Sequence, residues 1–131
     1  MSPVTLETDR FVHGVWGEAA HDLEWHPGRP LNIGWHCSDR LCRLGLGEKP
    51  ALLWEDHQGN ARRYTFDDLR LLTNTMAEFL RHEGGLHPGE RICLFLDRVP
   101  ELYFGFLSIL KMGGIAQPLF SAFGDDSLWT R

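Results

Sequence analysis

The 131-residue sequence predicts an α/β fold in which an N-terminal helical arm and a hairpin precede the first strand–helix–strand units of a larger, incomplete parallel sheet. Two patterns support this prediction. The run 91–96 (RICLFL) is continuously apolar, which is typical of a strand buried on both faces of a parallel sheet. A helical pattern over 99–111 then leads to a second apolar run at 115–120. Because strand–helix–strand crossovers are right-handed, the two runs are predicted to be parallel neighbours with an exposed sheet edge.

The segments before this unit predict a helix and a hairpin. Apolar residues recur at helical spacing from 32 to 44, and Gly45 and Gly47 follow as a stop. Strands are predicted at 51–55 and 62–65, on either side of the polar turn 56–60. The two strands are therefore expected to pair as a hairpin.

Two longer helices are predicted from their starts and their apolar stripes. Thr65 can cap a helix that runs to about Glu83, and Pro100 suits the first turn of the helix at 99–111. Lys111 would complement the negative end of that second helix. The expected buried stripes are Leu69, Leu72, Met76, Phe79 and Leu80 in the first helix, and Leu102, Phe106, Ile109 and Leu110 in the second.

Residues 1–30 form the least regular part and are interpreted as an arm, with the main unit at 31–131. Phe11, Val12, Val15 and Trp16 predict one short amphipathic turn, and the segment 26–30 (HPGRP) breaks any helix. The arm either packs on another part of a larger protein or is a partly disordered leader.

The amino-acid composition limits the cellular compartments and the kinds of partner that can be expected. A net charge of -5 with scattered arginines disfavours nucleic acid as a partner. The three cysteines show no CxxC spacing, which favours a reducing compartment. There is no apolar run near the length of a membrane span and no signal-peptide pattern, so a soluble cytoplasmic protein is expected, without membrane contact.

Several candidate chemistries are weak. The closest metal-ligand cluster is His36, Cys37 and Cys42, whose spacing does not match zinc sites, so no metal site is predicted. The pair Gly45 and Gly47 lacks the preceding strand of a dinucleotide loop, and neither lysine follows a phosphate-binding loop. Asp125 and Asp126 fit the first turn of a helix better than general-base catalysis.

The loop 120–124 (FSAFG) is the strongest candidate for function. In open parallel sheets, ligands bind beyond the carboxyl ends of the strands, and small residues there permit close approach. Ser121 has no histidine near it in sequence, so a catalytic triad cannot be argued. A packed strand-to-helix turn is the competing interpretation.

At this point an ordered series of motifs resembles one family. The series is similar to the N-terminal region of AMP-forming acetyl-CoA synthetases, in the acyl-adenylate-forming superfamily. It covers residues 31 to 131, and its ending indicates an acetate or propionate user. The motifs are LNIGWHCSDR at 31–40, KPALLWE at 49–55, RYTFDDL at 63–69, PGER at 88–91, RVPEL at 98–102, LKMG at 110–113 and PLFSAFG at 118–124.

The resemblance implies a ligase that forms acyl-AMP from ATP and a carboxylic acid and then transfers the acyl group to coenzyme A. It implies ATP, Mg²⁺ and coenzyme A for the full-length family and no cofactor within these residues. The family's phosphate loop and catalytic lysine have no counterpart here, so no catalytic residue is assigned and the chain alone is expected to be inactive. Ser121 and Ala122 correspond to a segment near the coenzyme A entry side.

Three interpretations compete at the level of sequence. The first is an N-terminal part of an acetate or short-chain acyl-CoA ligase, whose partner would be the remainder of the ligase or a second copy. The second is a free-standing, non-catalytic binding or regulatory module derived from that fold. The third, a small flavodoxin-like nucleotide binder, would need a phosphate loop after its first strand, and residues 55–60 do not offer one.

Overall fold

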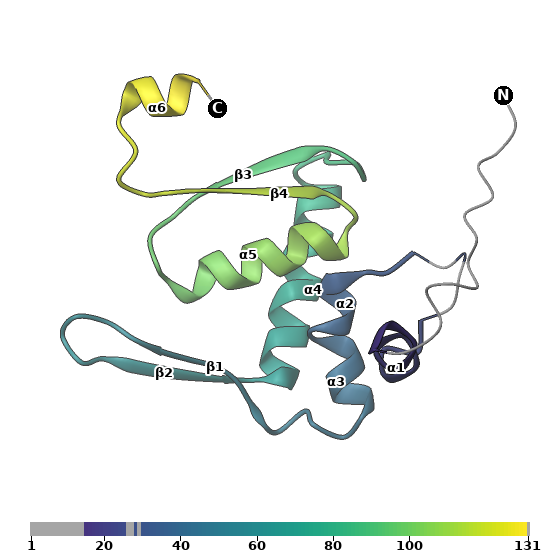
Figure 1. Ribbon diagram of the computed structural model, residues 1–131. Helices are drawn as coiled ribbons and strands as arrows, with labels where there is room; N and C mark the ends of the chain where they lie inside the picture. Colours follow the sequence, from purple (N-terminus) through teal and green to yellow (C-terminus); the bar gives the residue numbers. More distant parts are fainter. Residues whose placement is uncertain (1–14, 26–27, 29, 131) are drawn as a thin grey trace, which may run out of the picture. The chain divides into compact units, whose positions relative to one another are not determined.

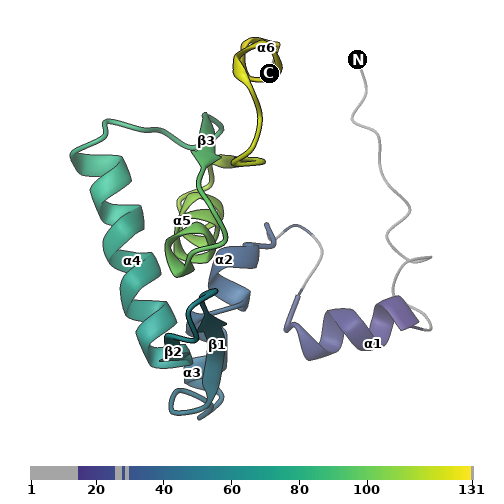
Figure 2. The same cartoon turned by 90° about the vertical axis from the view of Figure 1, so that its left-hand side faces the viewer.

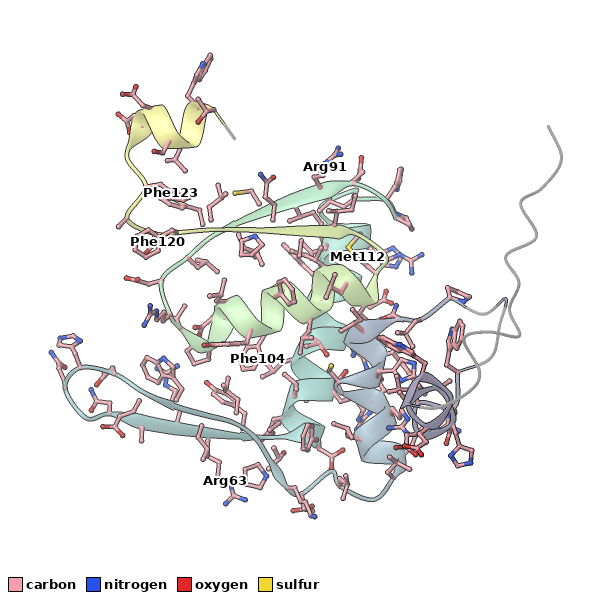
Figure 3. All side chains as sticks on the ribbon, in the orientation of Figure 1. Arg63, Arg91, Phe104, Met112, Phe120 and Phe123 are labelled. Atoms are coloured by element: carbon pink, nitrogen blue, oxygen red, sulfur yellow. The ribbon has the colours of Figure 1, made fainter. Side chains whose placement is uncertain are left out.

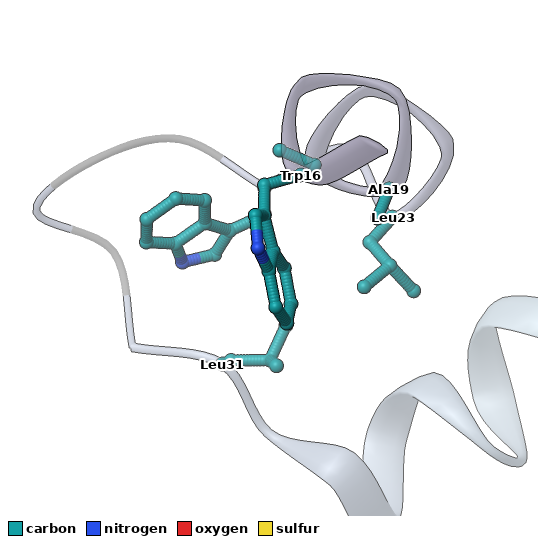
Figure 4. A pocket seen from close by; sticks show the side chains of 6 residues that line it. Trp16, Ala19, Leu23 and Leu31 are labelled. Atoms are coloured by element: carbon teal, nitrogen blue, oxygen red, sulfur yellow. The ribbon is translucent and has the colours of Figure 1, made fainter. Parts of the chain in front are cut away.

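The computed structural model describes residues 15–25, 28 and 30–130, which fall into two compact units, Met1–Leu31 and Asn32–Arg131. The first unit contains helix α1 (Val15–Asp22). Two tryptophans, Trp16 and Trp25, line an apolar hollow of about 320 Å³ with side chains of α1 and Leu31 (Figure 4). The predicted contribution of Phe11 and Val12 lies outside the described residues.

The second unit begins with two short helices where the sequence predicts one. Helix α2 (Ile33–His36) is capped by Asn32, whose side-chain oxygen accepts a hydrogen bond from the Trp35 amide at 2.9 Å. Helix α3 (Asp39–Arg43) follows after a break at Ser38. The Ser38 hydroxyl, fully buried, donates to the Gly34 carbonyl at 2.6 Å. This side-chain bond competes with the helical backbone pattern and explains the break.

Strands β1 (Pro50–Glu55) and β2 (Ala61–Thr65) form the predicted antiparallel hairpin, with an irregularity between Pro50 and Leu52. The turn is organised by Asp56, whose carboxylate accepts hydrogen bonds from the amides of Gln58 and Asn60, both at 2.8 Å. A hydrogen bond from the Asn60 side-chain amide, together with these two backbone bonds, holds the pKa of Asp56 below its usual value. The turn is thus built from residues adjacent in sequence.

Helix α4 (Phe66–His82) starts at the predicted cap, where Thr65 and Asp68 form a reciprocal capping box. The predicted apolar stripe is only partly correct, because Leu69 is buried and Met76 and Leu80 are half-buried. The buried residues are Leu69, Thr73 and Ala77, whereas Leu72 and Phe79 are exposed. Thr73 enters the core because its hydroxyl donates to the Leu69 carbonyl at 2.7 Å, which satisfies its polar atom.

The parallel unit consists of β3 (Arg91–Phe95), α5 (Pro100–Lys111) and β4 (Ile115–Leu119), and Figure 1 shows α5 running along one face of the two strands. The strands pair in parallel from Arg91↔Ile115 to Phe95↔Leu119, which confirms the predicted neighbours. The predicted buried side of α5 is only partly correct. Phe106 is 36% exposed, and the buried residues of α5 are Pro100, Phe104, Gly105, Ser108 and Ile109.

The prediction that the apolar strands are covered on two faces is wrong for the described residues. In β3 only Leu94 is buried, while Cys93 and Phe95, which point to the other face, are exposed. Figure 3 shows Arg91, on that same face, pointing away from α5. The reason is that α5 packs against one face, whereas no other described helix contacts the two strands as extensively.

Helix α5 is the centre of the second unit. It contacts α4, α2 and both parallel strands, and Figure 2 shows it nearly end-on between α4 and α2. Gly34 permits the close approach of α2, because a Cβ atom there would lie 2.7 Å from the Lys111 amide nitrogen. Asn32 adds a hydrogen bond from its side-chain amide to the Lys111 carbonyl at 2.9 Å.

The chain's described part ends in a short helix after β4. Helix α6 (Asp125–Trp129) has acidic residues in its first turn, as predicted, and its Trp129 is 92% exposed. No helix among the described residues combines the length and the apolar composition needed to cross a membrane.

Candidate functional site

The carboxyl ends of β3 and β4 lie side by side because the two strands are parallel and in register to Phe95 and Leu119. The chain leaves β3 through residues 96–99 and leaves β4 through residues 120–124. The two loops therefore meet at one edge of the sheet, which is where ligands bind in open parallel sheets. Ser121 and Ala122, the two residues that the sequence analysis singles out, belong to the second of these loops.

A hollow of about 240 Å³ lies between these two loops. Its polar side chains come from Asp97, Arg98 and Ser121, and its other lining residues are apolar. We call it the strand-end hollow. The residues that line it are Leu96, Asp97, Arg98, Leu102, Pro118, Leu119, Phe120 and Ser121.

Ser121 faces the β3 side of the strand-end hollow. Its hydroxyl donates a hydrogen bond to the Asp97 carboxylate at 2.9 Å. That bond uses the hydroxyl hydrogen, so the oxygen is left with acceptor capacity towards a ligand. The partner of Ser121 is thus a carboxylate, an arrangement that orients the hydroxyl and does not form a Ser–His couple.

Ala122 occupies a different position from Ser121. It is exposed in the turn after β4 and does not line the hollow. The turn is closed by a hydrogen bond from the Phe123 amide to the Phe120 carbonyl at 3.0 Å, and the two rings meet edge to face at 5.7 Å between centroids (Figure 3). The small methyl of Ala122 leaves the outside of this turn open.

The β1–β2 hairpin also contacts the loop after β3, although it lies much earlier in the sequence. The Trp54 indole N–H donates to the Arg98 carbonyl at 2.7 Å, across 44 residues. Sequence reasoning missed this contact, because a tryptophan in a strand gives no sign of its partner. Asp97 was missed as well, and its place directly after β3 was the signal that could have indicated it.

An apolar hollow of about 490 Å³ adjoins this site and shares Leu102 and Pro118 with the strand-end hollow. It lies where the hairpin, α4, α5 and β4 come together, and Tyr103 and Phe106 on its wall are partly exposed. Its lining is almost entirely apolar, so it offers packing surface and few groups for chemistry.

Lys111 is not available to the site. Its ammonium group contacts the Asp39 carboxylate at 2.5 Å, the Thr73 hydroxyl at 2.7 Å and the Asn74 side-chain oxygen at 2.9 Å. An ammonium group has three donors, and all three are used. The sequence explanation, complementation of the α5 terminus, was incomplete, because the side chain joins α3, α4 and α5.

Asp39 completes this junction. Its burial raises the pKa of the carboxyl, but hydrogen bonds from Lys111, Ser38 and Asn74 outweigh that effect, and the net pKa is below the usual 3.8. The carboxylate is therefore ionised at neutral pH and paired with Lys111. The Lys111 junction, formed by Asp39, Thr73, Asn74 and Lys111, is a structural feature that shares no residue with the strand-end hollow.

Metal and thiol chemistry find little support in the described residues. Among them, no group of three histidine, cysteine or acidic side chains has a metal-binding arrangement. Burial raises the pKa of the Cys42 thiol, and Asp67 acts in the same direction. The thiol is therefore protonated at neutral pH, which makes it a poor nucleophile.

The fold is an α/β unit with a hollow between the loops that follow its two parallel strands. Comparison with known proteins gives the family: the model of the AMP-binding enzyme family matches residues 44–130. The chain belongs to this family. The matched segment includes the hairpin, the β3–α5–β4 unit and the loop with Ser121.

Curated relatives agree with this assignment. The chain is 33% identical over 123 residues to an acetyl-coenzyme A synthetase of Bacillus subtilis, a match that covers 94% of this chain and 21% of the relative. It is 29% identical to an acetyl-coenzyme A synthetase of Deinococcus radiodurans, covering 88% of this chain and 20% of the relative. The chain thus spans about a fifth of the length of these relatives.

Solved structures give the same result. An acyl-CoA synthetase of Brucella canis superposes with a TM-score of 0.79 at 28% identity, over 93% of this chain and 22% of that one. An acetoacetyl-CoA synthetase of Streptomyces lividans superposes with a TM-score of 0.71 at 28% identity, over 82% and 16%. The predicted α/β class and the family resemblance are both confirmed.

Proposed function

We propose that this chain forms the opening part of an AMP-forming acyl-CoA ligase, with residues 1–30 as an arm and residues 31–131 as the beginning of its N-terminal domain. The ligase would activate acetate or propionate with ATP as acyl-AMP, release pyrophosphate and then form the thioester with coenzyme A. The observation that carries this proposal is the family match across residues 44–130, which runs through the loop at the strand ends.

The chain would supply a binding edge and no reacting group. Formation of acyl-AMP requires cations that neutralise the developing charge on the phosphates. The two lysines of the chain are unsuited to this task, because Lys49 is exposed on the hairpin side and the Lys111 ammonium is fully engaged. The 131 residues alone are therefore expected to be inactive.

Within this proposal, Ser121 and Ala122 face coenzyme A. The Ser121 oxygen can accept a hydrogen bond from a pantetheine amide, and the Ala122 turn gives room beside it. The strand-end hollow, at about 240 Å³, accommodates only a segment of such a ligand. Coenzyme A is accordingly expected to bind weakly or not at all until other parts of the ligase complete the site.

ATP and Mg²⁺ are expected to be held elsewhere in the ligase. No described residue offers a set of ligands for a metal ion, and the described loops lack a lysine-ended phosphate loop. When bound, Mg²⁺ would neutralise the charge of the triphosphate. The partner that completes the enzyme would then be the remainder of the same ligase.

Acid-dependent exchange of pyrophosphate into ATP tests this proposal. The purified 131-residue chain is assayed with acetate and with propionate, alone and after coexpression with the Bacillus subtilis relative from which the matched N-terminal segment has been deleted. We expect no exchange from either part alone and measurable exchange from the pair. The relative's own N-terminal segment, coexpressed with the same deletion, is the positive control.

Two results would contradict the proposal. Exchange by the 131-residue chain alone, at confirmed mass and purity, would show that the chemistry resides in these residues. A positive control that restores exchange, together with this chain failing to associate with the deleted relative in a pull-down, would show that the chain does not serve as the opening part of such a ligase.

A further inference from the structure

We propose that Trp54 is a positioning residue for the strand-end hollow: it fixes the loop after β3 so that Asp97 holds Ser121. The inference rests on the proposed function only in treating this hollow as a ligand site. The contact between the hairpin and the loop is independent of that function. It joins an element that precedes the parallel unit to the place where the unit's two strands end.

Strand alternation explains why Trp54 reaches this loop. Side chains two residues apart in a strand point to the same face, and Trp54 pairs across the hairpin with Arg62. The face that carries Trp54 turns towards α5, where Tyr64 meets Phe104 edge to face at 4.9 Å between ring centroids. The opposite face carries Leu53, 71% exposed, and Arg63, which projects away from α5 (Figure 3).

Besides its contact with the loop, the Trp54 ring packs against the guanidinium group of Arg62. The guanidinium carbon of Arg62 lies 5.5 Å from the ring centroid, within cation–π range. Arg62 also pairs with Glu101 in the first turn of α5 at 3.9 Å. The indole therefore has a fixed orientation, and its single N–H is aimed at the Arg98 carbonyl.

The loop transmits this contact to Ser121 through adjacent residues. Arg98, whose carbonyl accepts the indole bond, follows Asp97 directly, and the Val99 amide donates to the Asp97 carbonyl at 2.8 Å. The Asp97 carboxylate in turn accepts the Ser121 hydroxyl at 2.9 Å. Asp97, Arg98 and Val99 each take part in at least one of these hydrogen bonds. The bond from Trp54 is the one whose donor lies outside the β3–α5–β4 unit.

The substitution Trp54→Phe tests the proposal in the intact chain, because it keeps an aromatic ring and removes the N–H. We expect the NMR resonances of the Asp97 and Ser121 amides to move, and the Val99 amide to exchange with solvent about fivefold faster, as the loss of one hydrogen bond implies. Leu53→Ala, at the neighbouring exposed position of the same strand, is the matched control and should leave these resonances in place.

The reciprocal substitution Asp97→Ala reports from the other end of the contact. It changes an exposed side chain and should shift the indole N–H resonance of Trp54, which is identified among the five tryptophans by its loss in Trp54→Phe. This second variant keeps the proposal testable if Trp54→Phe does not fold. No ligand is needed, so a failure here is distinct from a failure of the pyrophosphate exchange test.

A purely structural Trp54 would lower the melting temperature and leave the Asp97 and Ser121 resonances of the folded protein unchanged. That result in Trp54→Phe, or an unmoved Trp54 indole resonance in Asp97→Ala, would overturn the proposal. Movement in both variants, with Leu53→Ala unchanged, would support it.

Discussion

The two faces of the β3–β4 sheet differ in their cover. On the face towards α5, Leu94 is 9% exposed and Ile109 of the helix is fully buried. On the opposite face, Phe95 is 45% exposed and Ile115 is 46% exposed. Both faces carry apolar side chains, and only one has a partner among the described residues. The difference shows that the helix side of the sheet is packed, whereas the other side exposes apolar surface, which favours association. We call these the packed side and the exposed side.

The packed side depends on the Lys111 junction, so Lys111→Ala should cause the largest loss of stability. It leaves Asp39, Thr73 and Asn74 without the cation that joins them, and it is expected to lower the free energy of unfolding by about 3 kcal/mol. Urea titration measures this change. Lys49→Ala, at the only other lysine of the sequence, is the control and should be close to neutral.

Gly34→Ala should give the next largest loss of stability on the packed side. A Cβ atom at this position would lie 2.5 Å from the Leu107 carbonyl oxygen and 2.7 Å from the Lys111 nitrogen, both in the backbone of α5. The helices would have to separate, at a cost of roughly 2 kcal/mol. Gly124→Ala, where nothing lies within 4 Å of the added methyl, should be tolerated, and equal losses in both variants would exclude the steric explanation.

Acid should weaken the same junction. The pKa of Asp39 is lower in the folded protein than its usual 3.8, so the unfolded chain takes up this proton first as the pH falls. The stability that the carboxylate provides is present above pH 3.8 and is lost as the pH falls through the lower folded pKa. Asp39→Asn should flatten this limb of a plot of unfolding free energy against pH. An unchanged limb would assign it to other carboxylates.

A charged residue introduced on the exposed side should weaken self-association without lowering the stability of the fold. The chain is expected to self-associate as its concentration rises, through the uncovered face and the free strand edges. Phe95→Lys should weaken this association at least tenfold in sedimentation velocity and leave the melting temperature nearly unchanged. Leu53→Lys alters another exposed apolar residue, away from this face, and should not affect association. A wild-type chain that stays monomeric over a wide concentration range would contradict the prediction.

Sequence reasoning succeeded where the structure is local. The cap at Thr65 was predicted, and Asp68, which completes it, lies only three positions further along the chain. The hairpin closes through a turn whose bonds all lie within residues 56–60. The parallel pair could be predicted as well, because the β3–α5–β4 order has a standard geometry. In each case the residues that decide the structure are close together in the sequence.

The remainder depended on distant partners. Lys111 and Asp39 are 72 residues apart, Trp54 and Arg98 are 44 apart, and Ser121 and Asp97 are 24 apart. Helical spacing predicted the apolar residues of α4 and α5 but could not show which side meets a neighbour. It therefore missed Thr73 and Ser108, polar residues that are buried because their hydroxyls bond to the preceding helical turn. For the same reason, the sequence analysis placed Ser121 in the loop after β4 but did not identify Asp97 as its hydrogen-bond partner.

Amide hydrogen exchange in a dilute monomeric sample tests most directly whether only one side of the sheet is packed. We predict strong protection of the amides that end α5, where Met112 bonds to Ser108 and Gly114 to Ile109, and almost none in α6, where a five-residue helix has little to pack against. Protection of α6 should appear when the remainder of a ligase is added. Strong protection of residues 125–130 in the isolated monomer would contradict this account and would favour a free-standing binding module.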